Sequence, residues 1–257
     1  MNIVGIIPAR MGSSRLPGKP LLNILDMSML EHCFRRCSMA VGLESTYIVT
    51  PDEEIISHVE SFGGKALLTS HSHTRAVSRT AEGLEILLDN GENIDGVVMV
   101  QGDEPLVSPD TIKEAFLALN EEEVDIANTM IRFRNQTDFN DINNIKVVID
   151  KDNNAMYYSR EPIPSKWQGW NDGEAAYMQI GIIAFRNDAL LKYYRTEETS
   201  LEIIEGTDMN RMLENGDKIR MILSDKYTIG VDTADELKRT EEIMKNDPTY
   251  LFYKSHK

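Results

Sequence analysis

Three cationic side chains stand on one segment near the start of the chain that is rich in glycine and proline. Arg10, Arg15 and Lys19 lie within residues 6–21 (IIPARMGSSRLPGKPL), which open on an apolar run that predicts a short buried strand. The first acidic residue is Asp26, although the 257-residue chain carries 42 acidic and 27 basic residues. Glycine lets backbone N–H groups approach phosphate oxygens, and arginine or lysine neutralises their charge. We predict a polyphosphate-binding loop; the alternative is a surface loop with three solvated cations.

This loop does not follow the Walker A pattern, G-x-x-x-x-G-K-[ST]. Gly12 and Gly18 are separated by five residues, and Pro20 follows Lys19 where that pattern needs a hydroxyl for Mg²⁺. A P-loop nucleotidase is therefore not expected.

Two aspartates follow predicted strands elsewhere in the chain. Asp103 lies in V-Q-G-D-E-P, directly after the strongly apolar residues 97–100, and Asp232 lies between a predicted strand at 228–231 and a helix cap. Acidic residues just past the carboxyl end of a central strand lie where open α/β sheets bind ligands. The alternative for each aspartate is a turn or capping role.

Together these segments resemble the signature blocks of the sugar-acid cytidylyltransferases, and among them the 3-deoxy-manno-octulosonate (KDO) enzymes. Matching blocks occur in the family's order at residues 6–21, 97–105, 145–164, 179–186 and 211–237. The resemblance implies an enzyme of cell-surface polysaccharide biosynthesis that transfers CMP from CTP to an acidic acceptor and releases pyrophosphate. It also implies a homodimer, and a Mg²⁺ ion held by Asp103 and Asp232.

The resemblance assigns the other candidate site residues as well. Residues with a catalytic role would be Arg10, Arg15, Lys19, Asp103 and Asp232, the three cations holding the triphosphate and the leaving pyrophosphate. Residues that bind the nucleotide would be Pro8, Ala9, Arg10, Arg15, Lys19, Thr69, Arg75, Ala76 and Gln101. Residues that bind the acceptor would be Arg160, Gln179, Ile183, Asp208, Met209 and Arg211.

Several of the acceptor positions depart from the family's pattern. The family's His and Tyr of R-H-[LI]-G-[IL]-Y are Gln179 and Ile183 here, and its Glu and Gln of L-E-Q-L-R are Asp208 and Met209. A sugar hydroxyl buried against Ile183 or Met209 would lose its partner, at a cost of roughly 1–3 kcal/mol. We therefore predict a smaller and more anionic acceptor, such as a phosphonate, a phosphoramidate-type phosphate or another acidic sugar. KDO itself, with ordinary sequence divergence, is the alternative.

Two other classes of protein remain as rivals. A GT-A glycosyltransferase would carry an Asp-x-Asp metal motif, but this chain has Gly102-Asp103-Glu104. A non-catalytic nucleotide-binding protein could lose the metal carboxylates, and both are present. The net charge of −15 argues against nucleic acid or an anionic membrane as a partner.

The remaining composition predicts a cytoplasmic protein. No apolar run reaches the roughly 18 residues of a membrane span, and no secretory signal is visible at the N-terminus. The only cysteines, Cys33 and Cys37, lie four apart in a predicted helix and are poorly placed to pair or to bind zinc. Two packed thiols in a reducing compartment are expected.

The elements that must position these residues predict an α/β fold. Short strands alternate with helices up to about residue 123, which favours a Rossmann-like, mostly parallel sheet of the nucleotidyltransferase (GT-A-like) type. Strand-like runs then predict an antiparallel extension over about 124–232, for the acceptor and dimerisation, before a C-terminal helix and tail at 233–257. Helix caps are predicted at Thr50, Thr199 and Thr233. The whole chain is expected to form one domain.

Overall fold

A nine-stranded sheet forms the centre of the structure, a computed structural model that describes residues 1–13, 15–170 and 175–255. Ser14 of the N-terminal loop lies outside the described residues. The strands of this sheet are β1 (Ile3–Pro8), β4 (Thr46–Thr50), β5 (Lys65–Leu68), β6 (Gly96–Val100), β7 (Ile126–Arg132), β8 (Lys146–Ile149), β9 (Ala155–Ser159), β10 (Tyr177–Arg186) and β11 (Arg220–Leu223). A separate small hairpin pairs β2 (Asn23–Ile24) with β3 (Met27–Ser28).

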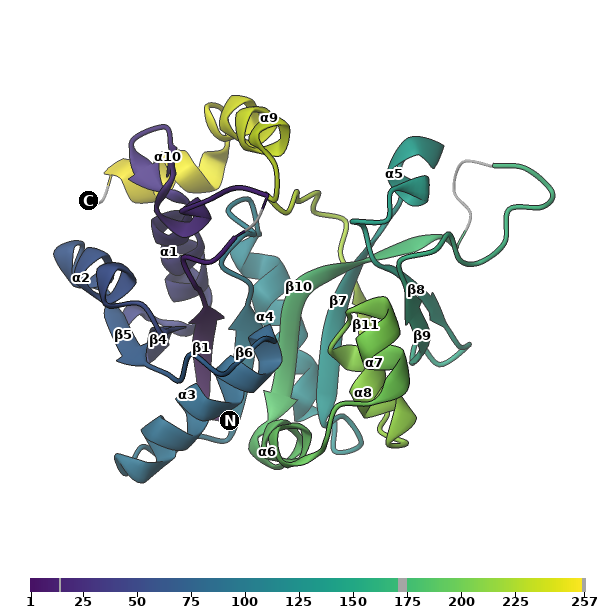
Figure 1. The fold of residues 1–257 in the computed structure, drawn as a ribbon, viewed down its shortest axis with the longest axis horizontal. Coiled ribbons are helices and arrows are strands. Elements are labelled where there is room, and N and C mark those ends of the chain that lie inside the picture. Colours follow the sequence, from purple (N-terminus) through teal and green to yellow (C-terminus); the bar gives the residue numbers. More distant parts are fainter. Residues whose placement is uncertain (14, 171–174, 256–257) are drawn as a thin grey trace.

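The order of the strands confirms the predicted mostly parallel sheet with an antiparallel extension. The path is β11-β7-β10-β6-β1-β4-β5, and β8 and β9 continue from β10 (Figure 1). Neighbours from β6 to β5 are parallel, as are β11 and β7. On this path β10 runs antiparallel to both of its neighbours, β6 and β7, and the pairs β10–β8 and β8–β9 are antiparallel as well. This reversed strand joins the two halves of the chain into one sheet.

Helices cover both faces of the sheet. One face packs against α1 (Met29–Val41), α2 (Glu53–Ser61) and α4 (Pro109–Leu117), and the other against α3 (Ala76–Asp89), α6 (Asn187–Arg195) and α8 (Met209–Glu214). The sequence of the central strand β6 is continuously apolar because its alternate side chains enter the cores on opposite faces of the sheet. Val97 and Met99 pack in the core under α3, α6 and α8, whereas Val98 and Val100 pack in the core under α1, α2 and α4.

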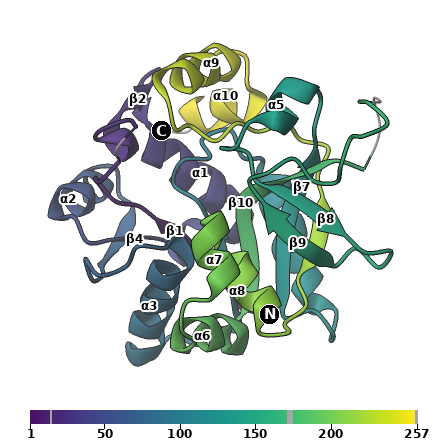
Figure 2. The same cartoon turned by 45° about the vertical axis from the view of Figure 1, so that its right-hand side comes forward.

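The remaining helices are α5 (Gln136–Asn140), α7 (Ser200–Glu205), α9 (Ala234–Met244) and α10 (Pro248–Ser255). Short 3-10 turns occur at Lys19–Leu21, Leu43–Ser45 and Ala118–Asn120. Figure 2 shows α7 and α8 side by side next to β9. Among the described residues, no helix combines the length and the apolar character that crossing a membrane requires.

Local capping signals were reliable at two of the three predicted positions. Thr199 and Thr233 both form complete capping boxes, with Glu202 and Glu236. The cap predicted at Thr50 is wrong, because α2 begins at Glu53 after Asp52 and receives no side-chain hydrogen bond at its N-cap. The Asp52 carboxylate instead accepts a hydrogen bond from Met11 N at 2.7 Å and so holds the N-terminal loop.

The strand predicted at 228–231 is also wrong, since this segment belongs to no strand of the sheet. Val231 N donates one hydrogen bond to Asp103 O, at 2.9 Å. The segment therefore crosses the end of the sheet, where it meets the turn after β6 rather than a neighbouring strand. As expected, both cysteines are buried free thiols.

The C-terminal helices are held to α1 by a buried histidine. His32 Nε2 donates to Ile24 O at 2.8 Å, so Nδ1 of the neutral ring accepts from Tyr253 Oη at 2.5 Å. Burial lowers the pKa of His32 to about 4. The neutral imidazole is thus a structural link between α10, the β2–β3 hairpin and α1.

This link predicts an acid-sensitive contribution to stability. Below about pH 6.5 the unfolded chain binds a proton at His32, whereas the folded chain resists protonation down to about pH 4. The free energy of unfolding should therefore fall with decreasing pH, by roughly 3 kcal/mol over this window. Denaturant unfolding at several pH values, with His32→Gln as the control, measures the difference. If the free energy of unfolding fell by the same amount in the wild-type protein and in His32→Gln, the prediction for His32 would be wrong.

Candidate active site

Two cavities open side by side where β1 and β6 end. The loop-side cavity has a volume of about 320 Å³ and is lined by the N-terminal loop and the start of α3. The strand-side cavity has a volume of about 430 Å³ and is lined by the ends of β7 and β10 and by the segment that leads into α9. The lining residues that both share are Thr74, Arg75, Ala76, Gln101, Asp103 and Asp232. A molecule in one cavity can therefore reach a molecule in the other at the two aspartates.

Lys19 lies between these aspartates. Its Nζ is 2.8 Å from Asp103 Oδ2 and 2.8 Å from Asp232 Oδ1, and Arg15 Nη2 is 2.8 Å from Asp232 Oδ2. Burial by itself would lower the pKa of Lys19, but the two carboxylates outweigh it and the pKa is raised. The ammonium group therefore stays charged, and Arg15 and Lys19 form one cluster with the two carboxylates.

Backbone contacts hold the two aspartates next to each other. The hydrogen bond from Val231 N to Asp103 O, at 2.9 Å, joins the two segments that carry them. The Glu236 carboxylate of the α9 capping box accepts from Asp232 N and Thr233 N, each at 2.8 Å. The start of α9 thus fixes the backbone of Asp232, while the end of β6 fixes that of Asp103.

The carboxylate pair fits a Mg²⁺ ion that is shared with a phosphate ligand. Mg²⁺ in phosphoryl-transfer sites is commonly bound by one or two carboxylates together with substrate phosphates. Asp103 and Asp232 already accommodate a cation between them, the ammonium of Lys19. No set of three or more His, Cys, Asp or Glu side chains within the described ranges could hold a metal ion. An ion at this point would therefore complete its coordination with oxygens of a bound substrate and with water.

Glu104, which has no assigned role in the sequence analysis, supports the same corner of the site. It is buried and accepts hydrogen bonds from Thr228 Oγ1 at 2.8 Å and Gly181 N at 3.3 Å. Burial, and next the charge of Asp103, raise the pKa of Glu104 to about 7. Its only signal in the sequence is its place next to Asp103. It ties β10 and the 228–231 segment to the turn after β6.

Most of the residues predicted to bind the nucleotide line the loop-side cavity. These are Pro8, Ala9, Arg10, Arg15, Lys19, Arg75, Ala76 and Gln101. Thr69 does not line the cavity, because it is buried and accepts a hydrogen bond from Arg79 Nη1 at 2.7 Å. Arg79 itself lines the cavity and also donates to Ser70 O and His73 O. Arg79 therefore organises the wall between β5 and α3, a role that the sequence analysis missed although it assigned Arg75 and Ala76, a few residues earlier, to the nucleotide.

The six residues predicted to bind the acceptor divide into two groups. Gln179, Ile183 and Asp208 line the strand-side cavity. Met209 is fully buried in the core beside the sheet, and Arg160 donates to Glu205 O and Ile142 O. Arg211 is buried and forms two hydrogen bonds with the Glu202 carboxylate, at 2.6 and 2.8 Å. The last three residues thus support the cavity wall without lining it.

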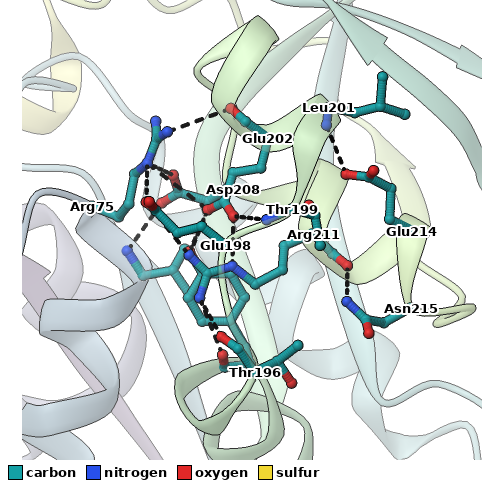
Figure 3. Close-up of polar contacts among 12 residues, drawn as sticks. Arg75, Thr196, Glu198, Thr199, Leu201, Glu202, Asp208, Arg211, Glu214 and Asn215 are labelled. Atoms are coloured by element: carbon teal, nitrogen blue, oxygen red, sulfur yellow. Dashed lines mark hydrogen bonds and ion pairs between the residues drawn. The ribbon is translucent and has the colours of Figure 1, made fainter.

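Figure 3 shows the network that joins this wall to the loop-side cavity. Arg75 Nε, at the start of α3, is 3.4 Å from a carboxylate oxygen of Glu198 and 3.8 Å from oxygens of Glu202 and Asp208. Asp208 also accepts from Val77 N at 3.2 Å, and burial raises its pKa to about 6. Arg75 lines both cavities, so it connects the two halves of the site.

Gly181 provides a way to disturb the shared corner without removing a polar group. Gln101 N donates to Gly181 O at 2.8 Å, and a Cβ on Gly181 would come within 2.8 Å of the Gln101 side chain. We expect Gly181→Ala to displace the Gln101 amide, because that side chain can move more readily than the sheet. Turnover should fall at least tenfold while the melting temperature changes little. Gly12→Ala, with no atom within 4 Å of the added methyl, is the control for stability. Unchanged turnover would show that Gln101 has no role at the centre.

Comparison with known proteins places this site in a family. The chain matches the family described as cytidylyltransferase over residues 4–219. It is 37% identical over 255 residues to the 3-deoxy-manno-octulosonate cytidylyltransferase of Geotalea uraniireducens, covering 95% of this chain and 100% of the relative. The enzyme of the same name from Thermodesulfovibrio yellowstonii is 34% identical over 251 residues, covering 95% and 98%.

Solved structures agree with the sequence comparison. A CMP:2-keto-3-deoxy-manno-octonic acid synthetase complexed with CTP superposes with a TM-score of 0.84 at 30% identity, covering 95% of this chain and 99% of that chain. A structure named as a putative glucose-1-phosphate thymidylyltransferase from Bacillus anthracis superposes with a TM-score of 0.68 at 16% identity. The match covers 95% of this chain and 96% of that chain. The second similarity concerns the fold alone.

Proposed function

The chain belongs to the cytidylyltransferase family, and from that premise we propose that it transfers CMP from CTP to a small acidic acceptor, releases pyrophosphate and uses Mg²⁺. The observation that carries this proposal is the meeting of two cavities at Asp103, Asp232 and Lys19. The loop-side cavity would hold the nucleotide, and the strand-side cavity would hold the acceptor. Membership of this family favours a cytidylyltransferase over the glycosyltransferase and the non-catalytic rivals.

The loop cations would bind the triphosphate. Arg10, Arg15 and Lys19 line the loop-side cavity, and both Arg15 and Lys19 reach the carboxylate cluster at its junction with the strand-side cavity. Charged donors held at this position would stabilise the negative charge that builds on the leaving pyrophosphate. A Mg²⁺ ion held by Asp103 and Asp232 would supply further neutralisation of charge on the reacting phosphate.

The acceptor oxygen would attack the α-phosphorus in line with the leaving pyrophosphate. An oxygen on phosphorus or on an anomeric carbon is already acidic, so the reaction needs no dedicated general base. Burial raises the pKa of the neighbouring Glu104 carboxyl to about 7, but its two oxygens already accept hydrogen bonds from Gly181 and Thr228. Its proposed role is therefore to orient the wall of the site.

The strand-side cavity supports an acceptor with few hydroxyl groups. Ile183 presents an apolar side chain where the family has Tyr, and the Met209 side chain is buried in the core. Gln179 Oε1 is buried without a hydrogen-bond partner among the described residues, so it can accept one donor from a ligand. One polar position in place of several suits a small acid better than a polyhydroxylated sugar. The homodimer and the cytoplasmic location remain predictions.

Substituting the two aspartates tests the catalytic centre. Asp103→Asn and Asp232→Asn each remove one negative charge from the proposed Mg²⁺ site. The transition-state stabilisation calculated from kcat/KM should therefore fall by several kcal/mol in each variant. Initial rates at saturating Mg²⁺ give the comparison, and circular dichroism confirms folding. Asp235→Asn, which removes one negative charge from the first turn of α9 but lines neither cavity, is the matched control. Near-native turnover in both Asn variants would refute the metal assignment.

A panel of acceptors tests the reaction and the acceptor together. With CTP and Mg²⁺ the protein should release pyrophosphate faster with phosphonates than with KDO, and ATP or GTP should not replace CTP. The double variant Gln179→His with Ile183→Tyr should partly raise activity toward KDO, because it restores two hydrogen-bonding groups. A kcat/KM for KDO above about 10⁴ M⁻¹s⁻¹ would refute the small-acceptor proposal. No pyrophosphate release with any acid would refute the proposed function.

A further inference from the structure

Two guanidinium groups flank one tyrosine ring in the strand-side cavity. Arg134 Cζ is 4.4 Å from the centroid of the Tyr227 ring, and Arg239 Cζ is 6.0 Å from it. Arg239 Nη2 also donates to Tyr227 Oη at 2.9 Å. The three residues come from the loop after β7, the segment before Asp232, and α9, and all three line the strand-side cavity. Segments distant in the sequence thus place two cations against one ring.

This clamp of Arg134, Tyr227 and Arg239 is tied to the reacting centre through α9. The helix begins two residues after Asp232, and its Glu236 side chain holds the Asp232 backbone N–H. Arg239 lies three residues beyond Glu236, on the same side of the helix. A ligand group that contacts Asp232 and another that contacts Arg239 would therefore lie along one wall of the same cavity.

The charges around the cavity single out the clamp. The carboxylates that line it all accept hydrogen bonds from protein donors; they are Asp103, Glu104, Asp138, Asp141, Asp208, Asp232 and Glu236. Arg134 and Arg239, by contrast, form no ion pair within 4.0 Å in the part of the chain that the structure describes. Both arginines are solvent-exposed, so in a chain with a net charge of −15 their guanidinium groups can meet an anion that enters the cavity lined by Tyr227.

We propose that the clamp of Arg134, Tyr227 and Arg239 binds a second anionic group of the acceptor, distinct from the oxygen that attacks CTP. The inference rests on the proposed function and narrows its substrate class to acids with two anionic groups. Arginine presents a planar fork of donors that matches a carboxylate or phosphonate, and the tyrosine ring limits where each fork can point. The clamp would compensate for the hydroxyl contacts that Ile183 does not make.

Matched acceptor pairs isolate the second anionic group. Methylphosphonate and phosphonoacetate share the reacting phosphonate, but only phosphonoacetate carries an additional carboxylate. Phosphonoacetate and its carboxyl methyl ester form a second pair, which differs in the charge of the carboxylate alone. We expect the wild-type protein to show a lower KM for the more anionic member of whichever pair it turns over.

Substitution of the clamp should abolish this preference. Arg134→Gln and Arg239→Gln should each raise the KM for the more anionic member on the order of tenfold, without changing kcat or the KM for CTP. The KM for the less anionic member should stay the same. Lys226→Gln and Lys238→Gln remove nearby cations that do not line this cavity, so they control for a general change of charge.

A binding measurement separates the two proposals. Calorimetric titration of phosphonoacetate into each variant, with CTP and Mg²⁺ absent, reports on the clamp without turnover. Binding that is weakened in both arginine variants and kept in both lysine variants supports the clamp, even if no acid releases pyrophosphate and the proposed function fails. Turnover with equal KM values and equal binding in arginine and lysine variants would overturn the clamp and leave the proposed function intact.

Discussion

The structure depends on the contact of one ammonium group with two carboxylates. Lys19 meets Asp103 across 84 residues of sequence and Asp232 across 213, each at 2.8 Å. Parallel strands make this contact possible, because β1 and β6 are neighbours that end at the same edge of the sheet. The N-terminal loop, the turn after β6 and the entry to α9 then share one point. Without a positive charge there, the two aspartates would repel each other, so the cation belongs to the fold as well as to the chemistry.

The reversed strand β10 makes a second cavity possible beside the first. It lies between β6 and β7, and its Gly181 approaches both Gln101 and Glu104. A side chain at Gly181 would occupy the space of Gln101, so the missing Cβ lets the strand pass close to the end of β6. Gln179 and Ile183, on either side of Gly181, face the strand-side cavity. One strand thus connects the parallel half of the sheet to the walls that would select the acceptor.

Charge is distributed unevenly over this acidic protein. The loop-side cavity gathers Arg10, Arg15 and Lys19, which suits a triphosphate. Away from this loop, Arg211 is bound by Glu202 and supports the cavity wall without lining it, whereas Arg75 contacts Glu198, Glu202 and Asp208 and also lines both cavities (Figure 3). Arginine therefore performs two different tasks, and access to a cavity distinguishes them.

The amino-acid sequence by itself determined most of the elements and indicated the residues of the proposed reacting centre. The glycine- and proline-rich loop, the apolar strand at 97–100 and the capping boxes at Thr199 and Thr233 are local patterns, and the structure contains all of them. Such patterns are legible because periodicity and capping depend on residues a few positions apart. The family's signature blocks also assign Asp103 and Asp232 as a pair, and in the structure both carboxylates contact Lys19.

Only the tertiary structure decided which side chains line the two cavities. The same block supplies Asp208 to the cavity wall and Met209 to the core, since neighbouring residues on a helix point in different directions. Asp52 holds the N-terminal loop instead of capping α2, and Val231 bonds to Asp103 instead of a strand. The clamp of Arg134, Tyr227 and Arg239 has no sequence signature. Each of these outcomes depends on partners that lie far away in the sequence, and packing alone brings those partners together.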